Sequence, residues 1–287
     1  MKTMEMSKGS GNFAVMSKHN FTTMYSFSIM LSRIGRHAGQ LLLSAIVCMA
    51  FTSAQAQTRV IAHRGYWDTT GSAQNSLTSL RLADKAGCYG SEFDVHLTRD
   101  NQIVVFHDDY VKGLPIQKTD YKILLRHRLR NGEAIPTLAQ YLDAAKGLST
   151  RLILEIKHQY SKSHEDSLVD ATVATVRAKG LQDRTEYISF SKNACIRLHQ
   201  LCPGAKIAYL AGDWDPQTAK ANGMTGIDYE QTLLATHIEW IRQCHDLGLT
   251  VNVWTVNDLN AIDDWVKAGV DFITTNKPVE ALKLAGN

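Results

Sequence analysis

The sequence beyond residue 58 alternates between short β-rich segments and helical patterns. Eight segments have the composition of strands, namely 59–65, 90–98, 151–158, 185–191, 206–212, 226–230, 250–257 and 271–275. Helical spacing of apolar residues is expected over 75–87, 137–147, 164–180, 192–202, 216–222, 237–247, 259–268 and 278–285. Eight strand–helix units in a chain of this length predict a closed TIM (β/α)8 barrel. An open doubly wound sheet is the alternative, but "HRGYWDTTG" at 63–71 matches poorly the Gly-rich turn which that fold would place after its first strand.

The second strand differs from the others because a hairpin partner, not a helix, follows it. The run "IVVFHDD" at 103–109 is joined to the strand by the turn residues Asp100 and Asn101. Residues 109–136 are then polar and irregular before the next helix. We therefore expect a small insertion after the second strand, at about 109–136.

The N-terminal segment has the pattern of a secretory signal peptide. Basic residues at Arg33 and Arg36 precede an apolar run over 41–51, and Ala54-Gln55-Ala56 resembles a small-x-small cleavage site. The run is short for a membrane span, which needs about 20 residues. We expect residues 1–56 to be an extension and signal peptide and 57–287 to be the barrel. Cleavage near Ala56-Gln57 would give a periplasmic or secreted protein with no stable membrane span.

The barrel segment is nearly neutral and does not have the excess of basic residues typical of nucleic-acid-binding proteins. Five of the 31 basic and one of the 28 acidic residues precede Gln57, which leaves 26 against 27. No basic stripe remains, so a nucleic-acid partner is not expected. Four cysteines lie in this segment without a paired metal-binding spacing, and we expect free thiols at Cys88, Cys195, Cys202 and Cys244. The oligomeric state is not specified by any pattern.

Acidic side chains interrupt two strands that should be almost wholly apolar, because both faces of a barrel strand are covered. Glu92 and Asp94 lie two apart near the end of the second strand, and Glu155 and Lys157 end the third. Residues i and i+2 share a face of a strand, so each pair points the same way. Three converging carboxylates would repel one another unless a cation lay between them, which predicts one Mg²⁺ or Ca²⁺ ion held by oxygen ligands. Structural ion pairs, Glu155 with Lys157 or Asp94 with Arg64, are the alternative.

Two histidines near the same strand ends are candidates for proton transfer. His63 ends the first strand and His107 closes the second apolar run, so one could remove a proton while the other donates one. Arg64 and Lys157 suit an anionic substrate, and phosphate is the obvious candidate. We expect His96 to play a supporting or surface role and not to be a ligand.

Six motifs together resemble the glycerophosphodiester phosphodiesterases. They are "HRG" at 63–65, "QNS" at 74–76, "EFDVHLTRDNQIVVFHDD" at 92–109, "IPTL" at 135–138, "EIK" at 155–157 and "WTVN" at 254–257. They occur in the order and spacing of that family and span almost the whole barrel segment. The resemblance implies a TIM barrel with an insertion after the second strand, and metal-dependent hydrolysis of glycerophosphodiesters to an alcohol and glycerol 3-phosphate.

Individual roles follow from the same resemblance. It implies that the metal ligands are Glu92, Asp94 and Glu155, that the general acid and base are His63 and His107, and that phosphate-binding groups are Arg64 and Lys157. It also implies that Trp254 is an apolar wall beside the glycerol moiety, although simple barrel packing is equally compatible with that residue. Attack could come from water or from a neighbouring substrate hydroxyl.

Two positions depart from the family pattern, each replacing an acid with an amide. Gln74 stands where a Pro-Glu-Asn-Thr run usually has Glu, and Asn276 stands where a Thr-Asp-x-Pro run usually has Asp. Both changes could shift metal preference or substrate. Alternative activities are a related phosphodiesterase acting on lysophospholipid, phosphoinositol or teichoic-acid substrates, and a non-catalytic exported module that binds a phosphorylated ligand.

Overall fold

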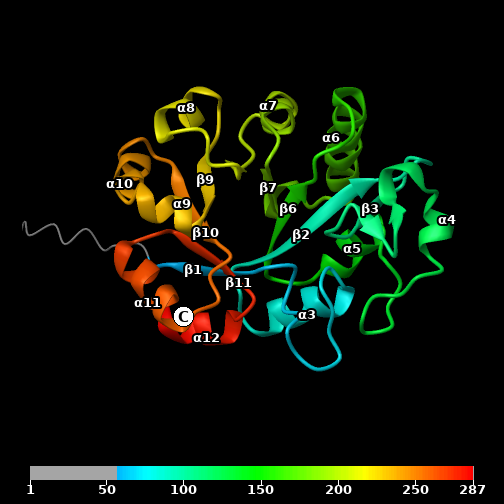
Figure 1. Cartoon of the computed structure of the whole chain (residues 1–287), viewed down its shortest axis with the longest axis horizontal. Helices are drawn as coiled ribbons and strands as arrows, with labels where there is room; N and C mark the ends of the chain where they lie inside the picture. The colour runs from blue at the N-terminus through cyan, green and yellow to red at the C-terminus, as the bar shows by residue number, and fades with distance from the viewer. Residues whose placement is uncertain (1–56, 287) are drawn as a thin grey trace, which may run out of the picture. The chain divides into compact units, whose positions relative to one another are not determined.

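A computed structural model describes residues 57–286 of the chain. Eight parallel strands form its centre: β1 (Arg59–Ala62), β2 (Gly90–Leu97), β6 (Arg151–Ile156), β7 (Thr185–Ser189), β8 (Ile207–Tyr209), β9 (Gly226–Glu230), β10 (Thr250–Trp254) and β11 (Phe272–Thr275). β1 pairs with β11 through Arg59 and Phe272, and also with β2 through Ile61 and Gly90. The sheet therefore closes on itself, which confirms the predicted TIM barrel (Figure 1).

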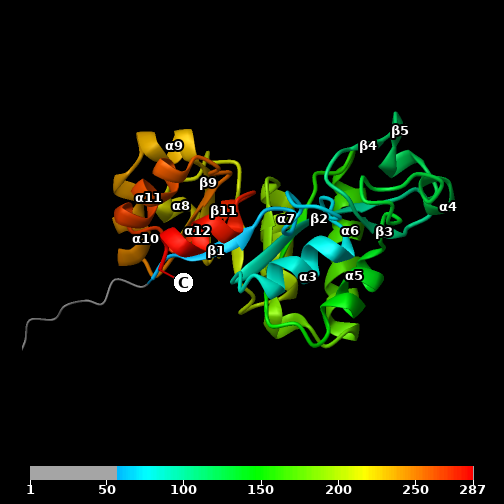
Figure 2. The same ribbon diagram turned by 90° about the horizontal axis from the view of Figure 1, so that it is seen from below.

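Helices surround the strands in Figures 1 and 2. They are α3 (Leu77–Lys85), α5 (Leu138–Ala145), α6 (Lys162–Ala178), α7 (Lys192–Leu201), α8 (Pro216–Ala221), α9 (Gln231–Thr236), α10 (Glu239–Asp246), α11 (Leu259–Ala268) and α12 (Pro278–Leu284), with a short 3₁₀ turn, η3, at Gln182–Arg184. Several begin at residues whose side chains accept a backbone N–H of the first turn, such as Thr137 before α5 and Asp258 before α11. The apolar spacing did not predict α9, which the Glu230 carboxylate caps.

Alternate residues of each strand pack on opposite sides of the barrel wall. One side packs against the helices, as where the ring of Phe93 stacks on Tyr141 with centroids 4.3 Å apart. The other side forms a smaller apolar cluster inside the barrel that includes Ile61, Ile153 and Ile188. Gly90 permits this packing, because a Cβ there would lie 2.7 Å from Cγ1 of Ile153. Apolar side chains thus fill much of the barrel interior, and the site lies toward one end of it.

Strand β2 ends at Leu97, one residue before the predicted end at 98. Its last residues pair antiparallel with β3 (Ile103–Val105), with Val95 opposite Val105. Glu92 and Asp94 therefore lie within the strand and not at its end, which corrects their predicted position. The hairpin explains the difference, because backbone partners on β3 allow β2 to extend farther than a barrel strand alone would.

The insertion contains short elements where the sequence predicted irregular chain. They are β4 (Tyr110–Val111), β5 (Leu114–Pro115), η2 (Ile116–Lys118) and α4 (Tyr121–Leu124), seen at the right of Figure 1 and the upper right of Figure 2. Most of its apolar residues turn inward. Val111, Ile116 and Leu124 are buried in a cluster of their own with Val104 of β3. The insertion is therefore a small folded lobe with its own core.

The four cysteines at 88, 195, 202 and 244 are free thiols, as expected. No helix described between residues 57 and 286 has both the length and the apolar character that crossing a bilayer requires. The proposed signal peptide lies outside the described residues, so its cleavage, the domain boundary there and the export of the protein stay predictions.

Candidate active site

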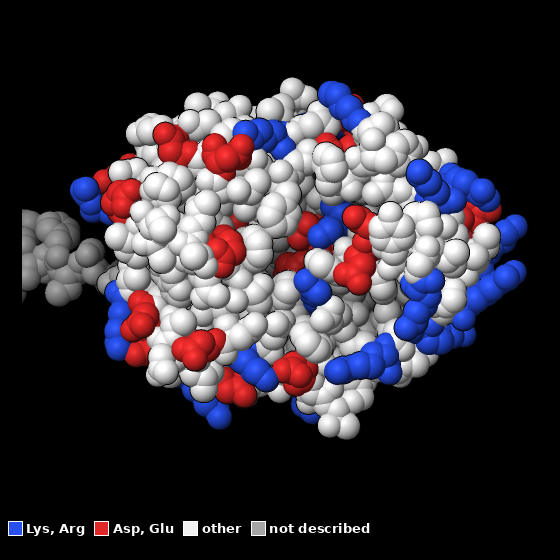
Figure 3. Space-filling view, viewed as in Figure 1, with Lys and Arg blue, Asp and Glu red and all other residues white. Residues whose placement is uncertain are grey.

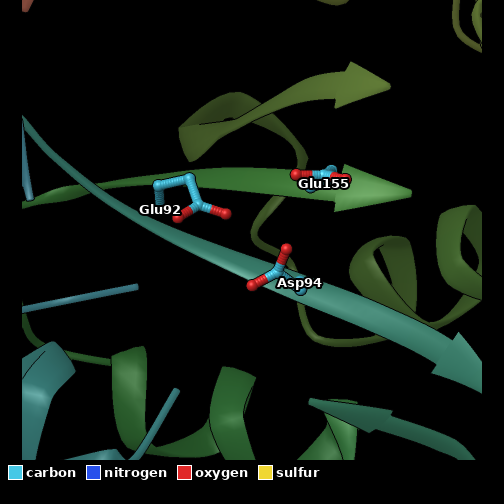
Figure 4. Close-up of side chains that lie close together, drawn as sticks. All are labelled: Glu92, Asp94 and Glu155. Carbon is cyan, nitrogen blue, oxygen red and sulfur yellow. The ribbon is translucent and has the colours of Figure 1, made fainter. Parts of the chain in front are cut away.

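Three buried carboxylates meet near one end of the barrel. Asp94 on β2 lies directly opposite Glu155 on β6 in the parallel register, and Glu92 is two residues before Asp94 on the same face. Each residue offers one oxygen, and these oxygens all lie within 4.8 Å of one another (Figure 4). We call Glu92, Asp94 and Glu155 the acidic cluster. All three residues are buried.

The acidic cluster has the properties of a cation site. Burial raises the pKa of Glu92 well above its ordinary value, and repulsion by Asp94 and Glu155 raises it further. Burial and the Asp94 charge likewise raise the pKa of Glu155 to about 8. One oxygen of Glu92, Oε1, is buried and has no hydrogen-bond partner among the described residues. A hard divalent cation would satisfy that oxygen and offset the repulsion, so the residues present fit such an ion.

Lys157 supplies one positive charge to the acidic cluster. Its Nζ lies 2.9 Å from Oε1 of Glu155 and 3.5 Å from Oδ1 of Asp94. Burial alone would raise the pKa of Asp94, but Lys157, His107 and a hydrogen bond from Asn75 lower it overall. The Glu155–Lys157 ion pair, considered above as an alternative to a metal site, is thus present, while Asp94 pairs with Lys157 and not with Arg64. One lysine does not balance all three carboxylates in their ionised form.

Arg64 enters the site from a tight turn after β1. Its φ is +56°, and its backbone N–H donates to Oε2 of Glu92 at 2.7 Å. The next residue must be glycine, because Gly65 has a φ of +75° and a Cβ there would lie 2.4 Å from Oγ of Ser79. The guanidinium donates to Oε1 of Gln74 at 2.7 Å, while its Nε has no partner among the described residues. Gln74 therefore orients Arg64 without contributing charge.

The partners of His63 determine which of its nitrogens carries a proton. Its Nδ1 lies 2.9 Å from Oδ1 of Asn276, and the indole Nε1 of Trp67 donates to the same atom at 3.1 Å. An indole N–H can only donate, so this atom of Asn276 is an oxygen and His63 must donate through Nδ1–H. Nε2 of His63 is left with its lone pair. Burial and the Arg64 charge lower the pKa of His63 to about 4, so the ring is neutral at pH 7.

His107 has a carboxylate partner where His63 has an amide. Its Nδ1 donates to Oδ1 of Asp108 at 2.7 Å. Burial lowers the pKa of His107, and Lys157 adds to this, while Asp94 and Asp108 act in the opposite direction. The carbonyl oxygen of His107 lies 3.2 Å from Nε2 of His96. His96 is fully buried, so a surface role is excluded and a supporting one is left.

A cavity of about 240 Å³ connects these groups with the far wall of the barrel. It is lined by His63, Arg64, Glu92, His107, Glu155, Lys157, Ile188, Phe190, Leu210, Asp228, Trp254, Thr255 and Thr274. Figure 3 shows acidic and basic side chains at a hollow near the centre of this face. Of the eight predicted site residues, the cavity brings together seven, and Asp94 belongs to the adjoining acidic cluster.

Trp254 forms part of the wall opposite the acidic cluster. Its indole Nε1 donates to the backbone oxygen of Asp228 at 2.9 Å, and its ring meets Phe190 edge-on with centroids 5.5 Å apart. The sequence interpretation missed Asn75 and Asp228, and it named Asn276 without its contact with His63. For Asp228 a signal existed, because an acid inside the buried strand "GIDYE" is as unusual as the acids at 92 and 94. The contacts of Asn75 and Asn276 depend on loop conformation and have no comparable signal.

Comparison with known proteins identifies the family. Residues 63–280 match the Glycerophosphoryl diester phosphodiesterase family. A solved glycerophosphodiester phosphodiesterase from Parabacteroides distasonis is 45% identical, with a TM-score of 0.80 over 81% of this chain and 98% of that one. A glycerophosphodiester phosphodiesterase of Caldanaerobacter subterraneus is 27% identical over 79% of this chain and 98% of its own length. An Oleispira antarctica phosphodiesterase, solved with the product sn-glycerol-3-phosphate, shares the fold at 24% identity and a TM-score of 0.70, covering 80% of this chain and 98% of that one.

The family match covers most of the chain and includes the turn at His63, the acidic cluster and Trp254. The chain therefore belongs to the glycerophosphoryl diester phosphodiesterase family and is an enzyme of that class.

Proposed function

We propose that the protein hydrolyses small glycerophosphodiesters to an alcohol and glycerol 3-phosphate with the help of one divalent cation, Mg²⁺ or Ca²⁺. The observation that carries this proposal is the buried acidic cluster, with an unpartnered Glu92 oxygen, in one cavity with two histidines and two cationic side chains. Glu92, Asp94 and Glu155 would hold the cation. When bound, it would polarise the phosphoryl group and offset developing negative charge.

The cationic side chains would position the phosphate. Arg64 has a free Nε and is held by Gln74, and Lys157 is held against the acidic cluster. A phosphate diester that meets both groups would lie beside His63 and His107, which line the same cavity. Charge-assisted hydrogen bonds of this kind are stronger than neutral ones and fix orientation.

The different partners of the two histidines suggest different tasks. His63 is neutral with a free Nε2, which suits a base that takes the proton from the attacking hydroxyl of water or of the adjacent substrate carbon. His107 donates to the Asp108 carboxylate, which opposes the lowering of the His107 pKa by burial, and this favours His107 over His63 as the acid. As the bond from phosphorus to the leaving oxygen breaks, His107 would transfer its proton to that oxygen, so that the leaving group departs as an alcohol and not as an alkoxide.

A direct assay tests the proposal. We expect glycerol 3-phosphate to be released from glycerophosphocholine and glycerophosphoethanolamine, release to stop after EDTA, and Mg²⁺ or Ca²⁺ to restore it. Release of phosphocholine would instead place cleavage on the other ester bond. No release with either metal would contradict the assignment to small diesters.

The amide at position 276 leads to a prediction about pH. In Asn276→Asp, a carboxylate would accept the Nδ1–H of His63 and favour its charged form, so the pKa of His63 should rise from about 4. A base works only when unprotonated, so the acidic limb of the kcat/KM profile should move to higher pH. The measurement is a pH profile for the wild type and the variant. Trp67→Phe, which removes only the other donor to Asn276, is the control and should move the limb much less.

A lipid-directed activity has weaker support. The insertion beside the site could present apolar residues to an acyl chain, but most of them are buried in its own cluster. Lysophosphatidylcholine as a substrate distinguishes the two activities, and we expect much slower cleavage than for glycerophosphocholine.

We also propose that the protein is exported, on the basis of the motif at residues 30–56. N-terminal sequencing of the protein recovered from the producing cell should give a sequence that starts at Gln57. A mature protein that retains residues 30–56 would contradict this.

A further inference from the structure

We propose that Asp228 determines specificity by accepting a hydrogen bond from a hydroxyl group of the substrate's polyol moiety. This inference rests on the proposed function and adds a residue to it. Asp228 lies on β9, which is separated from the acidic cluster on β2 and β6 by the two strands β7 and β8. It lines the same cavity as the acidic cluster, on the wall that also carries Trp254.

The Asp228 side chain is buried without the partners that a structural acid normally has. It is 2% exposed, and its Oδ1 has no hydrogen-bond partner among the described residues. No lysine or arginine forms a salt bridge with it in the described part of the chain. An unpaired buried polar atom of this kind is costly and is uncommon outside functional sites. A ligand that donates a hydrogen bond from within the cavity would remove that cost.

The neighbour that acts as a hydrogen-bond donor toward Asp228 is Asn252, and Oδ1 of Asp228 is still without a partner among the described residues. Asn252 lies opposite it in the register of β9 and β10, but its amide nitrogen donates to Oγ1 of Thr274 at 2.9 Å. Burial raises the pKa of Asp228 to about 7, although the nearby Asn252 amide opposes this. A carboxyl group that is partly neutral at pH 7 suits a hydroxyl better than an ammonium group, which would require the full charge.

The walls between the acidic cluster and Asp228 are apolar. Ile188, Leu210 and the ring of Trp254 line this part of the cavity, which is suited to contact with carbon atoms. A phosphate at Arg64 and Lys157 would therefore extend a short carbon chain along these walls and place a hydroxyl near Asp228. Glycerol has this arrangement, whereas an unsubstituted alkyl phosphate would leave the carboxyl group unpaired. Sites that bind a hydroxyl in this way strongly reject the analogue that lacks it.

Calorimetry of ligand binding to the full-length protein tests the role without requiring turnover. The probes, in the presence of Mg²⁺, are glycerol 3-phosphate and propyl phosphate, which differ only in two hydroxyl groups. The wild type should bind glycerol 3-phosphate about 10- to 100-fold more tightly. Asp228→Leu should abolish the difference and leave the affinity for propyl phosphate unchanged. Asp228→Asn keeps an acceptor oxygen in place and should retain most of the preference.

Two outcomes would overturn the role. Equal binding of both probes by the wild type would show that no hydroxyl is recognised, and an equal loss for both probes in Asp228→Leu would show that Asp228 is only structural. If that variant does not fold, as judged by thermal melting, Asp228→Ala carries the same prediction. A protein that prefers glycerol 3-phosphate but cleaves no diester would contradict the proposed function and leave this inference standing. A protein that cleaves the diester but does not prefer glycerol 3-phosphate would support the proposed function and contradict this inference.

Discussion

Replacing Glu92 by glutamine should lower kcat/KM for glycerophosphocholine by about 1,000-fold or more, the scale on which removal of a principal electrostatic group acts. The change preserves the shape of the side chain but removes one of the three charges of the acidic cluster. The measurement is steady-state hydrolysis across a titration of Mg²⁺ and Ca²⁺. If a high metal concentration restores the lost activity, the change has weakened cation binding. Unchanged activity would contradict the role of Glu92.

The same variant should be more stable than the wild type when metal is removed. In the metal-free protein, the folded-state pKa of Glu155 is about 8 against an ordinary 4.5, and that of Glu92 is raised too. An acid whose folded pKa is raised destabilises the fold as pH rises above its unfolded pKa. The metal-free wild type should therefore lose stability between about pH 4.5 and 8, and Glu92→Gln should lose less. Melting temperatures in EDTA measure this. Glu186→Gln, which removes a buried acid bonded to Tyr89 and Lys206, is the control and should lower stability.

The second large effect concerns His107. His107→Ala should reduce hydrolysis of glycerophosphocholine by about 100- to 10,000-fold, because choline leaves as a poor alkoxide unless an acid protonates it. Glycerol 4-nitrophenyl phosphate has a leaving group that needs no proton. We therefore expect a loss below about tenfold with that substrate.

His63→Ala provides the matched comparison, since a base acts on the nucleophile whatever the leaving group is. Its loss should be similarly large for both substrates. If instead His63→Ala is rescued by the nitrophenyl leaving group and His107→Ala is not, the two roles are exchanged. If neither variant depends on the leaving group, proton transfer to the leaving oxygen is not the task of either histidine.

The barrel was predictable because its signals are local. Each barrel strand and every large helix except α9 shows its own apolar period, and acids within "GSEFDVHLT" stand out against a background that should be apolar. Convergence of Glu92, Asp94 and Glu155 then follows from strand alternation and the parallel register, in which Asp94 lies opposite Glu155. The extent of β2 was predictable as well, to within one residue at its end, although its last residues pair with β3.

The contacts that tune the site could not be predicted in the same way. The Asn276–His63 contact joins residues near opposite ends of the described chain, and the positive φ of Arg64 is what directs its N–H toward Glu92. Neither depends on a periodic pattern. Asp228 could have been predicted from the sequence, because the reasoning applied to Glu92 and Asp94 holds equally for an acid in β9. The hydrogen bond beside it from Asn252 on β10 to Thr274 on β11 could not be predicted.

The pairing of β1 with β11 has a consequence for how the protein is made. The acidic cluster, Arg64, Lys157 and both histidines all lie between residues 63 and 157, whereas Asp228, Trp254 and Asn276 come much later in the chain. β1 cannot acquire its second neighbour until Phe272–Thr275 has left the ribosome. Such long-range closure slows folding. A nascent chain therefore contains every ligand of the acidic cluster long before it has a closed cavity, and competence for catalysis arises only with the last strand.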